Sequence, residues 1–153
     1  MTSQTDILIS LKPKHAEHIF GGKKTVELRK RRPKIGPGTR ICIYATSPIA
    51  AIKGYASLIQ IKSAPPADIW KTWGDQSGIS KNEFDSYFRN CKIAHALVLA
   101  NVMLMKRALS LERIRELIEG FQPPQFFFHL NGATNEMRLH FRKHKRIKSK
   151  RRH

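Results

Sequence analysis

Acidic residues are scarce in this 153-residue chain, which contains 11 Asp and Glu against 29 Lys and Arg. The formal net charge is therefore +18 at pH 7, and the isoelectric point lies near 10.5. Residues 1–130 carry 20 of the basic and 10 of the acidic residues, so the C-terminal end alone does not account for the charge. Such an excess predicts attraction to polyanions, of which nucleic acid is the commonest and an anionic membrane surface the second.

Cysteine and long apolar runs are also scarce. Cys42 and Cys91 each lie alone inside an apolar segment, which predicts reduced thiols rather than a disulfide or a metal pair. The chain has no run of about 18 apolar residues, and residues 1–6 lack the basic start and apolar core of a signal peptide. We therefore expect a protein of the cytoplasm, or of the nucleus in a eukaryote, with no membrane among its partners.

The motifs of metal and triad chemistry are missing as well. His15 and His18 stand on either side of Glu17, but zinc requires a third or fourth ligand and none follows at a motif spacing. Ser47 could place a hydroxyl at the rim of a cleft, but no His or Asp at a diagnostic spacing completes a triad with it. The turn chemistry of Ser47-Pro48 explains this serine equally well. The sequence thus indicates no metal site and no cofactor.

The segments that are present predict short or bent strands with helices in the connections. This order predicts an α+β fold, a small mixed β-barrel rather than a doubly wound parallel sheet. Residues 1–130 are expected to form that domain, and the basic residues 131–153 a tail that is disordered or helical only when bound. Gly54 predicts a bulge or bend inside a strand. Strands are expected at 7–11, 25–29, 39–45, 49–61, 92–109 and 125–130, and helices at 13–20, 65–73, 81–89 and 110–118.

The stretch 22–34 gathers basic side chains around a single acid. A glycine turn is followed there by a strand, whose alternation places Glu27 and Arg29 on the face opposite its apolar residues. Lys24 can reach the same cleft only if it lies at the turn, before regular pairing begins. The basic side chains of the stretch are Lys23, Lys24, Arg29, Lys30, Arg31, Arg32 and Lys34.

Three of these side chains form the candidate recognition set. Arg29 offers a planar fork to a phosphate or a guanine edge, and Lys24 offers a point charge to phosphate. Glu27 can accept a hydrogen bond from a base amine or a ribose hydroxyl. The alternative interpretation is a Glu–Arg ion pair on a solvated face, which contributes only about 0–1 kcal/mol.

Further candidate contacts are generic phosphate binders or aromatic platforms. The nucleic-acid-binding set predicted here comprises Lys12, Lys14, Lys23, Lys24, Glu27, Arg29, Arg31, Arg32 and Ser47. Trp70, Trp73, Tyr87 and Phe88 could stack on single-stranded bases, but their helical spacing favours packing in the core. In the strand 125–130, alternation leaves Phe127 opposite Phe126 and Phe128, so one side is expected to face outward, over a helix or along the cleft.

Four motifs in a fixed order suggest a family. They are Ser10-Leu11-Lys12-Pro13-Lys14, then Gly22-x-Lys24-x-x-Glu27-x-Arg29, then Ile43-Tyr44-Ala45-Thr46-Ser47-Pro48, and finally Phe121-Gln122-Pro123-Pro124-Gln125. Together, over residues 6–130, they resemble the ASCH domain family, part of the larger group of PUA-like β-barrels. The tail lies outside the resemblance.

The resemblance implies a barrel with a cleft between the first helix, the glycine turn and the following strand, and this cleft would hold RNA or a modified base. Some members of the family are reported as ribonucleases. A branch resembles amidohydrolases that act on an acylated cytidine nucleoside through a lysine, a threonine and a glutamate. Lys24 matches that lysine, whereas Glu27 occupies the threonine position and residues 75–77 offer no match for the glutamate.

The expected function is therefore binding of RNA or another nucleic acid in a basic cleft, without catalysis. One alternative is an enzyme of the same fold, a ribonuclease or a nucleoside-deacylating hydrolase, in which Lys24 and Glu27 transfer protons or activate the reacting group. Another is a transcription-coactivator-like interaction protein, which follows from the name of the family rather than from a residue.

Overall fold

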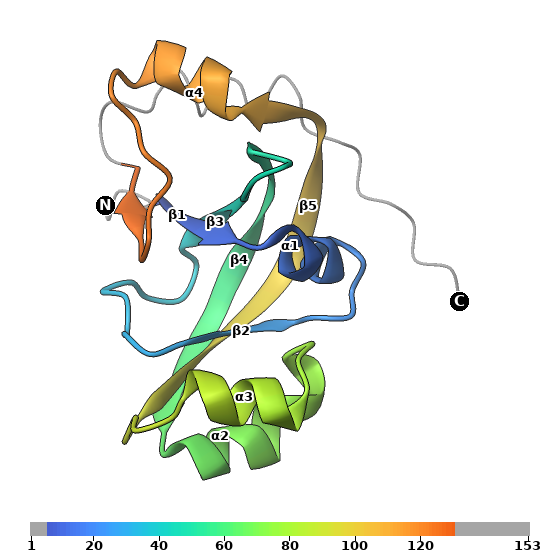
Figure 1. Cartoon of the computed structure of the whole chain (residues 1–153), viewed down its shortest axis with the longest axis vertical. Coiled ribbons are helices and arrows are strands. Elements are labelled where there is room, and N and C mark those ends of the chain that lie inside the picture. The colour runs from blue at the N-terminus through green and yellow to red at the C-terminus, as the bar shows by residue number, and fades with distance from the viewer. Residues whose placement is uncertain (1–5, 131–153) are drawn as a thin grey trace.

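A computed structural model describes residues 6–130 of the chain (Figure 1). The predicted tail, residues 131–153, lies outside the described residues. Within them the chain forms six strands, four α-helices and one short 3-10 helix. In chain order these are β1 (Asp6–Leu11), α1 (Pro13–Phe20), β2 (Val26–Arg29), β3 (Arg40–Ala45), β4 (Ala51–Ala64), α2 (Pro66–Trp73), η1 (Gly74–Gln76), α3 (Lys81–Tyr87), β5 (Ala94–Ser110), α4 (Leu111–Leu117) and β6 (Phe128–His129).

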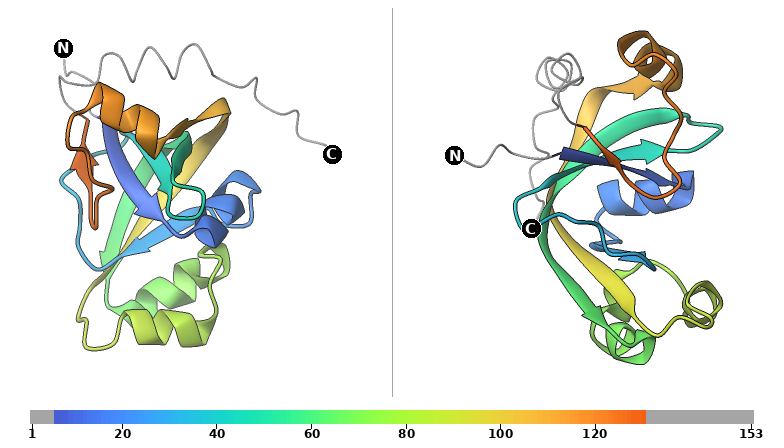
Figure 2. Two further views of the ribbon diagram at one scale, coloured as in Figure 1. Left: turned by 45° about the horizontal axis from the view of Figure 1, so that its top comes forward. Right: turned by 90° about the vertical axis from the view of Figure 1, so that its left-hand side faces the viewer.

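The strands form one sheet in the order β2-β5-β4-β3-β1-β6. β1 and β3 pair in parallel, and the other neighbouring pairs are antiparallel. β4 and β5 contain 14 and 17 residues and bend along their length, so that the sheet curls into a half-barrel (Figure 2). This sheet, with short helices in its connections, confirms the predicted α+β class and barrel-like fold.

Glycine at position 54 allows β4 to pass very close to its neighbours. The pairing of β4 with β5 shifts register between Ile52 and Gly54, which confirms the predicted bulge. A Cβ atom at position 54 would lie 2.1 Å from the carbonyl oxygen of Met103 and 2.7 Å from the ring of Phe20. The bend therefore depends on the absence of a side chain.

Two serines fix where helices begin. The hydroxyl of Ser80 accepts a hydrogen bond from the backbone N–H of Glu83 at 3.1 Å and caps α3. The hydroxyl of Ser110 accepts one from the N–H of Arg113 at 3.1 Å and caps α4. Such caps satisfy N–H groups that have no partner inside the helix.

Three hydrophobic clusters attach the helices to the sheet. In the first, Ala16 and Ile19 of α1 pack against β1, β3, β4 and β5. The second packs Ile114 of α4 against residues of β1, β3, β4 and β5. The third joins Ile69 of α2 and Phe84 of α3 to β2 and the start of β5. Different clusters hold α1 and α3, and the two helices lie on either side of β2 (Figure 1).

The aromatic residues of α2 and α3 divide between core and surface. Trp70 and Trp73 pack against the third cluster, and Phe88 is buried within it. The core interpretation is confirmed for these three rings. Tyr87, in contrast, is 38% exposed, so the fourth ring is available at the surface.

The last strand is shorter than the prediction of 125–130. β6 pairs with β1 only through His129 opposite Ile7 and Phe128 opposite Leu8. The chain bends at residues 125–126, directly after Pro123 and Pro124, which carry no N–H donor for a ladder. The three consecutive phenylalanines therefore do not follow one strand alternation.

Both cysteines are free, with Cys42 buried and Cys91 half-buried. Among residues 6–130, no helix is both long enough and apolar enough to span a membrane.

Candidate functional site

A cleft of about 610 Å³ opens between α1 and α3, with β2 at its floor. Its volume lies within the range of small-molecule sites, roughly 300–1,000 Å³. The residues that line it are Ser10, Leu11, Lys12, His15, Lys24, Glu27, Leu28, Arg29, Ile79, Asn82, Glu83, Ser86 and Tyr87.

The turn after α1 places Lys24 in this cleft. The backbone N–H groups of Lys23 and Lys24 both donate to the carbonyl oxygen of His18, at 2.9 and 3.0 Å. Gly22 takes a φ of +84°, which favours glycine because it has no Cβ. Lys24 thus precedes the regular pairing of β2, which is the condition under which it can share a cleft with Glu27.

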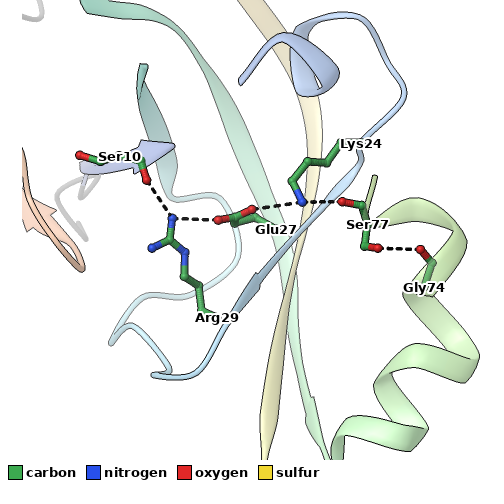
Figure 3. A network of polar contacts seen from close by, with 6 residues as sticks. All are labelled: Ser10, Lys24, Glu27, Arg29, Gly74 and Ser77. Atoms are coloured by element: carbon green, nitrogen blue, oxygen red, sulfur yellow. Dashed lines mark hydrogen bonds and ion pairs between the residues drawn. The ribbon is translucent and has the colours of Figure 1, made fainter. Parts of the chain in front are cut away.

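Glu27 stands between two cations at the floor of the cleft (Figure 3). Its Oε1 lies 3.2 Å from Nζ of Lys24, and its Oε2 lies 2.8 Å from Nη2 of Arg29. Lys24 also donates to the carbonyl oxygen of Ser77 at 2.6 Å, and Arg29 Nη2 donates to that of Ser10 at 3.3 Å. The ion-pair interpretation of Glu27 and Arg29 is confirmed, but the pair is buried rather than solvated.

We call Lys24, Glu27 and Arg29 the ion network. Its two cations outweigh the effect of burial on the pKa of Glu27. Burial alone would raise the pKa of Glu27, but Arg29 and Lys24 lower that pKa below its ordinary value. Lys24 and Glu27 are only 3% and 6% exposed, so solvent screens their attraction weakly. Glu27 is therefore a fixed anion that orients two cations, and a weak proton acceptor.

His15 of α1 is uncharged, in contrast to Glu27. Burial, and next the positive charge of Lys24, lower the pKa of His15 below its ordinary value. Its imidazole is consequently neutral at neutral pH. A neutral imidazole offers one N–H donor and one nitrogen acceptor.

Three buried side-chain polar atoms, each on a residue that lines the cleft, have no hydrogen-bond partner among residues 6–130. They are Oγ of Ser10, Nδ1 of His15 and Nε of Arg29, and all three residues line the cleft. Burying an unpaired polar group costs about 1–3 kcal/mol, so a cluster of three indicates groups that a ligand can satisfy. The set includes an N–H donor from the guanidinium and two groups that can donate or accept.

The predicted site residues separate into two groups. Lys12, Lys24, Glu27 and Arg29 line the cleft, whereas Lys14, Lys23, Arg31, Arg32 and Ser47 are not among its lining residues. Of this second group, the four cations are exposed. Arg32 donates to Oγ of Ser63 at 3.4 Å.

Sequence reasoning missed one wall of the cleft, although the sequence carries a signal for it. Helical spacing relates Asn82, Glu83, Ser86 and Tyr87, which places them along one face of α3, and Ile79 lies just before that helix. A mostly polar face on a helix is usually a solvated face, so the pattern alone does not indicate a site. The carbonyl of Ser77 has no sequence signal, because every residue offers a backbone acceptor.

Comparisons with known proteins agree with the fold. The chain matches the family described as a domain of unknown function (DUF365) over residues 5–121. An ASCH domain-containing ribonuclease of Zymomonas mobilis is 35% identical over 120 residues, which cover 78% of this chain and 80% of that protein.

A solved structure and a longer protein are also similar. The crystal structure of ASCH from Zymomonas mobilis has a TM-score of 0.85 and 31% sequence identity, and the match covers 92% of this chain and 96% of that chain. Large ribosomal subunit protein uL22 of Ureaplasma parvum is 37% identical over 98 residues, which are 63% of this chain but 31% of that protein. The ribonuclease of Zymomonas mobilis matches in sequence, and the ASCH crystal structure matches in fold, over most of their lengths and most of this chain. This chain therefore belongs to the ASCH domain family.

Proposed function

We propose that this chain binds RNA and holds one unpaired nucleotide in the cleft. The observation that carries the proposal is the set of three buried, unpartnered polar atoms on Ser10, His15 and Arg29. A nucleobase edge carries donors and acceptors at fixed positions, so it can satisfy several such groups at once.

The ion network favours a neutral polar ligand over a bare phosphate at the floor. Lys24 already contacts Glu27 and Ser77, and Nη2 of Arg29 already contacts Glu27 and Ser10. A phosphate placed there would lie beside the Glu27 carboxylate, and two like charges at close range repel each other. The floor is therefore suited to a base or ribose edge.

Phosphates find their partners outside the cleft. Lys14, Lys23, Arg31 and Arg32 are exposed, and Lys12 stands in the lining. In nucleic-acid complexes, exposed cations bind the phosphates while a separate site contacts the edge of a base. The cations around this cleft fit that arrangement. The ribonuclease name of the Zymomonas mobilis relative supports RNA as that polyanion.

A salt titration of RNA binding tests the proposal. We expect the affinity for a short unstructured RNA, measured by fluorescence anisotropy, to fall about a thousandfold between roughly 50 and 200 mM salt if about seven phosphates are contacted. His15→Ala should weaken binding by about five- to tenfold at every salt concentration, because it removes a neutral contact.

The matched control is Lys23→Ala, which removes an exposed charge outside the cleft. It should make the slope of log affinity against log salt shallower by about one contact. Wild-type binding that is absent or insensitive to salt would contradict the proposal.

A ribonuclease activity is a second candidate, and the neutral His15 favours it. His15 lines the same cleft, and its lowered pKa leaves the imidazole able to accept a proton at neutral pH. His15 could take the proton of a ribose 2′-hydroxyl, whose oxygen then attacks the adjacent phosphorus and expels the 5′-oxygen of the next nucleotide. The departing oxygen takes a proton from water, and the imidazolium returns its proton to the hydroxide that forms. Lys24 and Glu27 would then hold the charges of the site rather than transfer protons.

This candidate predicts cleavage that depends on one imidazole. We expect unstructured RNA to give products ending in a 2′,3′-cyclic phosphate, and His15→Ala to slow the reaction about 10²- to 10⁴-fold. The products can be resolved by electrophoresis and mass spectrometry. Intact RNA with the wild type, or equal rates with His15→Ala, would eliminate it. The deacylating and coactivator-like alternatives stay predictions, since no contact among residues 6–130 favours either.

A further inference from the structure

Three consecutive cations at the end of β2 each lie over an aromatic ring. The guanidinium carbon of Arg29 is 5.4 Å from the ring centre of Phe127, and that of Arg31 is 4.6 Å from the ring centre of Phe126. Between them in sequence, Nζ of Lys30 lies 4.7 Å from the ring centre of Tyr87. We call Arg31 and Phe126 the outer stacking pair.

The outer stacking pair is exposed, whereas its neighbours are packed. Phe127 and Phe128 pack against the first and second hydrophobic clusters. Phe126 is 46% exposed, and Arg31 is also exposed. An exposed cation–π pair stabilises the fold by only about 0.5–1 kcal/mol, which is small against the apolar surface that Phe126 leaves in water.

The outer stacking pair lies close to the cleft along the chain. Arg29 lines the cleft, and Arg31 follows two residues later, so their Cα atoms are at most about 7 Å apart. Tyr87 lines the cleft and is 38% exposed, which adds a second accessible ring beside Lys30. Cation–ring contacts thus lie both at the lining of the cleft and at the exposed surface that follows it in the chain.

We propose that the outer stacking pair is a second nucleotide-binding position, for the unpaired nucleotide next to the one in the cleft. This inference rests on the proposed function. The base would stack on the planar Arg31–Phe126 pair, and the exposed Arg32 would contact the adjoining phosphate. Stacking is tolerant of sequence because every base has a π-face, so this position contributes affinity and the cleft contributes selectivity.

The proposal separates single-stranded nucleic acid from other polyanions. An acidic polypeptide or inorganic polyphosphate can pair with Arg31, but neither has a ring to stack on Phe126. A duplex also offers no accessible base face at this position, since its bases are already stacked on one another. The partner is therefore a single strand of at least two nucleotides.

The test compares ligands of increasing length on the full chain. For the wild type, we expect a dinucleotide and a tetranucleotide to bind more tightly than the mononucleotide in calorimetry. Phe126→Ala should lower the affinity for the dinucleotide and the tetranucleotide by about 5- to 150-fold, which is the contribution of one stacked base. It should leave the affinity for the mononucleotide unchanged. Phe126→Trp keeps an aromatic ring and should restore the affinity for the longer ligands.

Two controls separate the effect of stacking from the loss of a charge and from the loss of an exposed apolar side chain. Ile59→Ala shortens another exposed apolar residue, which is 45% exposed, and should leave all affinities unchanged. Arg31→Ala and Arg32→Ala each remove one charge. Of the two, only Arg31 contacts a ring among residues 6–130, so Arg31→Ala should weaken dinucleotide binding more. The thermal unfolding of each variant shows whether it is folded.

Each outcome decides the matter. If Phe126→Ala changes RNA affinity no more than Ile59→Ala, the second position is refuted while the proposed function stands. If the wild type binds no RNA of any length, both fail together. If polyphosphate competes as effectively as an oligonucleotide of the same charge, the outer stacking pair is a charge contact only, and the stacking proposal is overturned.

Discussion

Glu27→Ala should lower the free energy of unfolding by about 3–5 kcal/mol, because it leaves Lys24 and Arg29 without their shared counter-charge. Both cations lie largely out of water, with side-chain exposures of 3% and 11%. Removing one partner from a buried ion network is far more destabilising than removing one from the surface, where water replaces the lost contact. Urea denaturation followed by circular dichroism measures the difference. The matched control is Glu17→Ala on α1, an exposed acid whose removal should change stability by less than about 0.5 kcal/mol.

The same network predicts how stability depends on pH. The pKa of Glu27 is lower in the folded chain than its ordinary value of 4.5, so the unfolded chain binds more protons between the two values. Its contribution is complete above about pH 4.5 and is lost as pH falls through the folded pKa. Glu27→Gln should lack this part of the acid dependence. Parallel stability profiles for wild type and Glu27→Gln across that range, or equal losses for Glu27→Ala and Glu17→Ala, would show that the network carries no such energy.

Gly54→Ala should destabilise the fold by about 3 kcal/mol, at the upper end of the usual cost of overpacking. The added methyl group would lie 2.1 Å from the carbonyl oxygen of Met103, and that oxygen belongs to the long strand β5. A backbone atom in the middle of a sheet cannot move aside without breaking ladder hydrogen bonds. The ring of Phe20, only 2.7 Å from the same point, would also have to shift, and Phe20 ends the helix that borders the cleft.

The control for this substitution is Gly36→Ala. Position 36 has no atom within 4 Å of an added Cβ and has no positive φ, so alanine should change stability by less than about 0.5 kcal/mol. Thermal unfolding of the two variants gives the comparison. Equal melting temperatures would show that the close approach of β4 and β5 relaxes at little cost.

Local patterns made most of the fold predictable. The strands and helices follow from alternation, proline and glycine positions and serine caps, all of which act over a few residues. The short β6 was not predictable from its phenylalanines, because the chain bends at residues 125–126 and leaves β1, which continues to Leu11. Exposure of Phe126 likewise depends on a bend and on a distant arginine rather than on its own neighbours in sequence.

The charged residues at the floor of the candidate site were predictable from the sequence, but their burial and the unsatisfied polar atoms near them were not. A glycine turn and strand alternation indicate that Lys24, Glu27 and Arg29 meet, and the three do line one cleft. The sequence does not show that the network is buried, which reverses the energetic weight of the ion pairs. Nor does it show that Ser10 and His15 retain unused polar atoms, since an unsatisfied group is recognised only when all of its neighbours are known.

The segment α2-η1-α3, which supplies the α3 wall of the cleft, is inserted between the two long strands β4 and β5. It meets the turn before β2 through two backbone carbonyls: Gln76 accepts from the N–H of Thr25 at 2.9 Å, and Ser77 accepts from the side chain of Lys24. Neither contact depends on the identity of a side chain in this segment. A different helical pair could replace the wall and leave the charged floor intact if it presented two carbonyls at these points and apolar side chains to Val26 and Leu28. The scaffold would then carry interchangeable specificities, with Lys24 as the common attachment point.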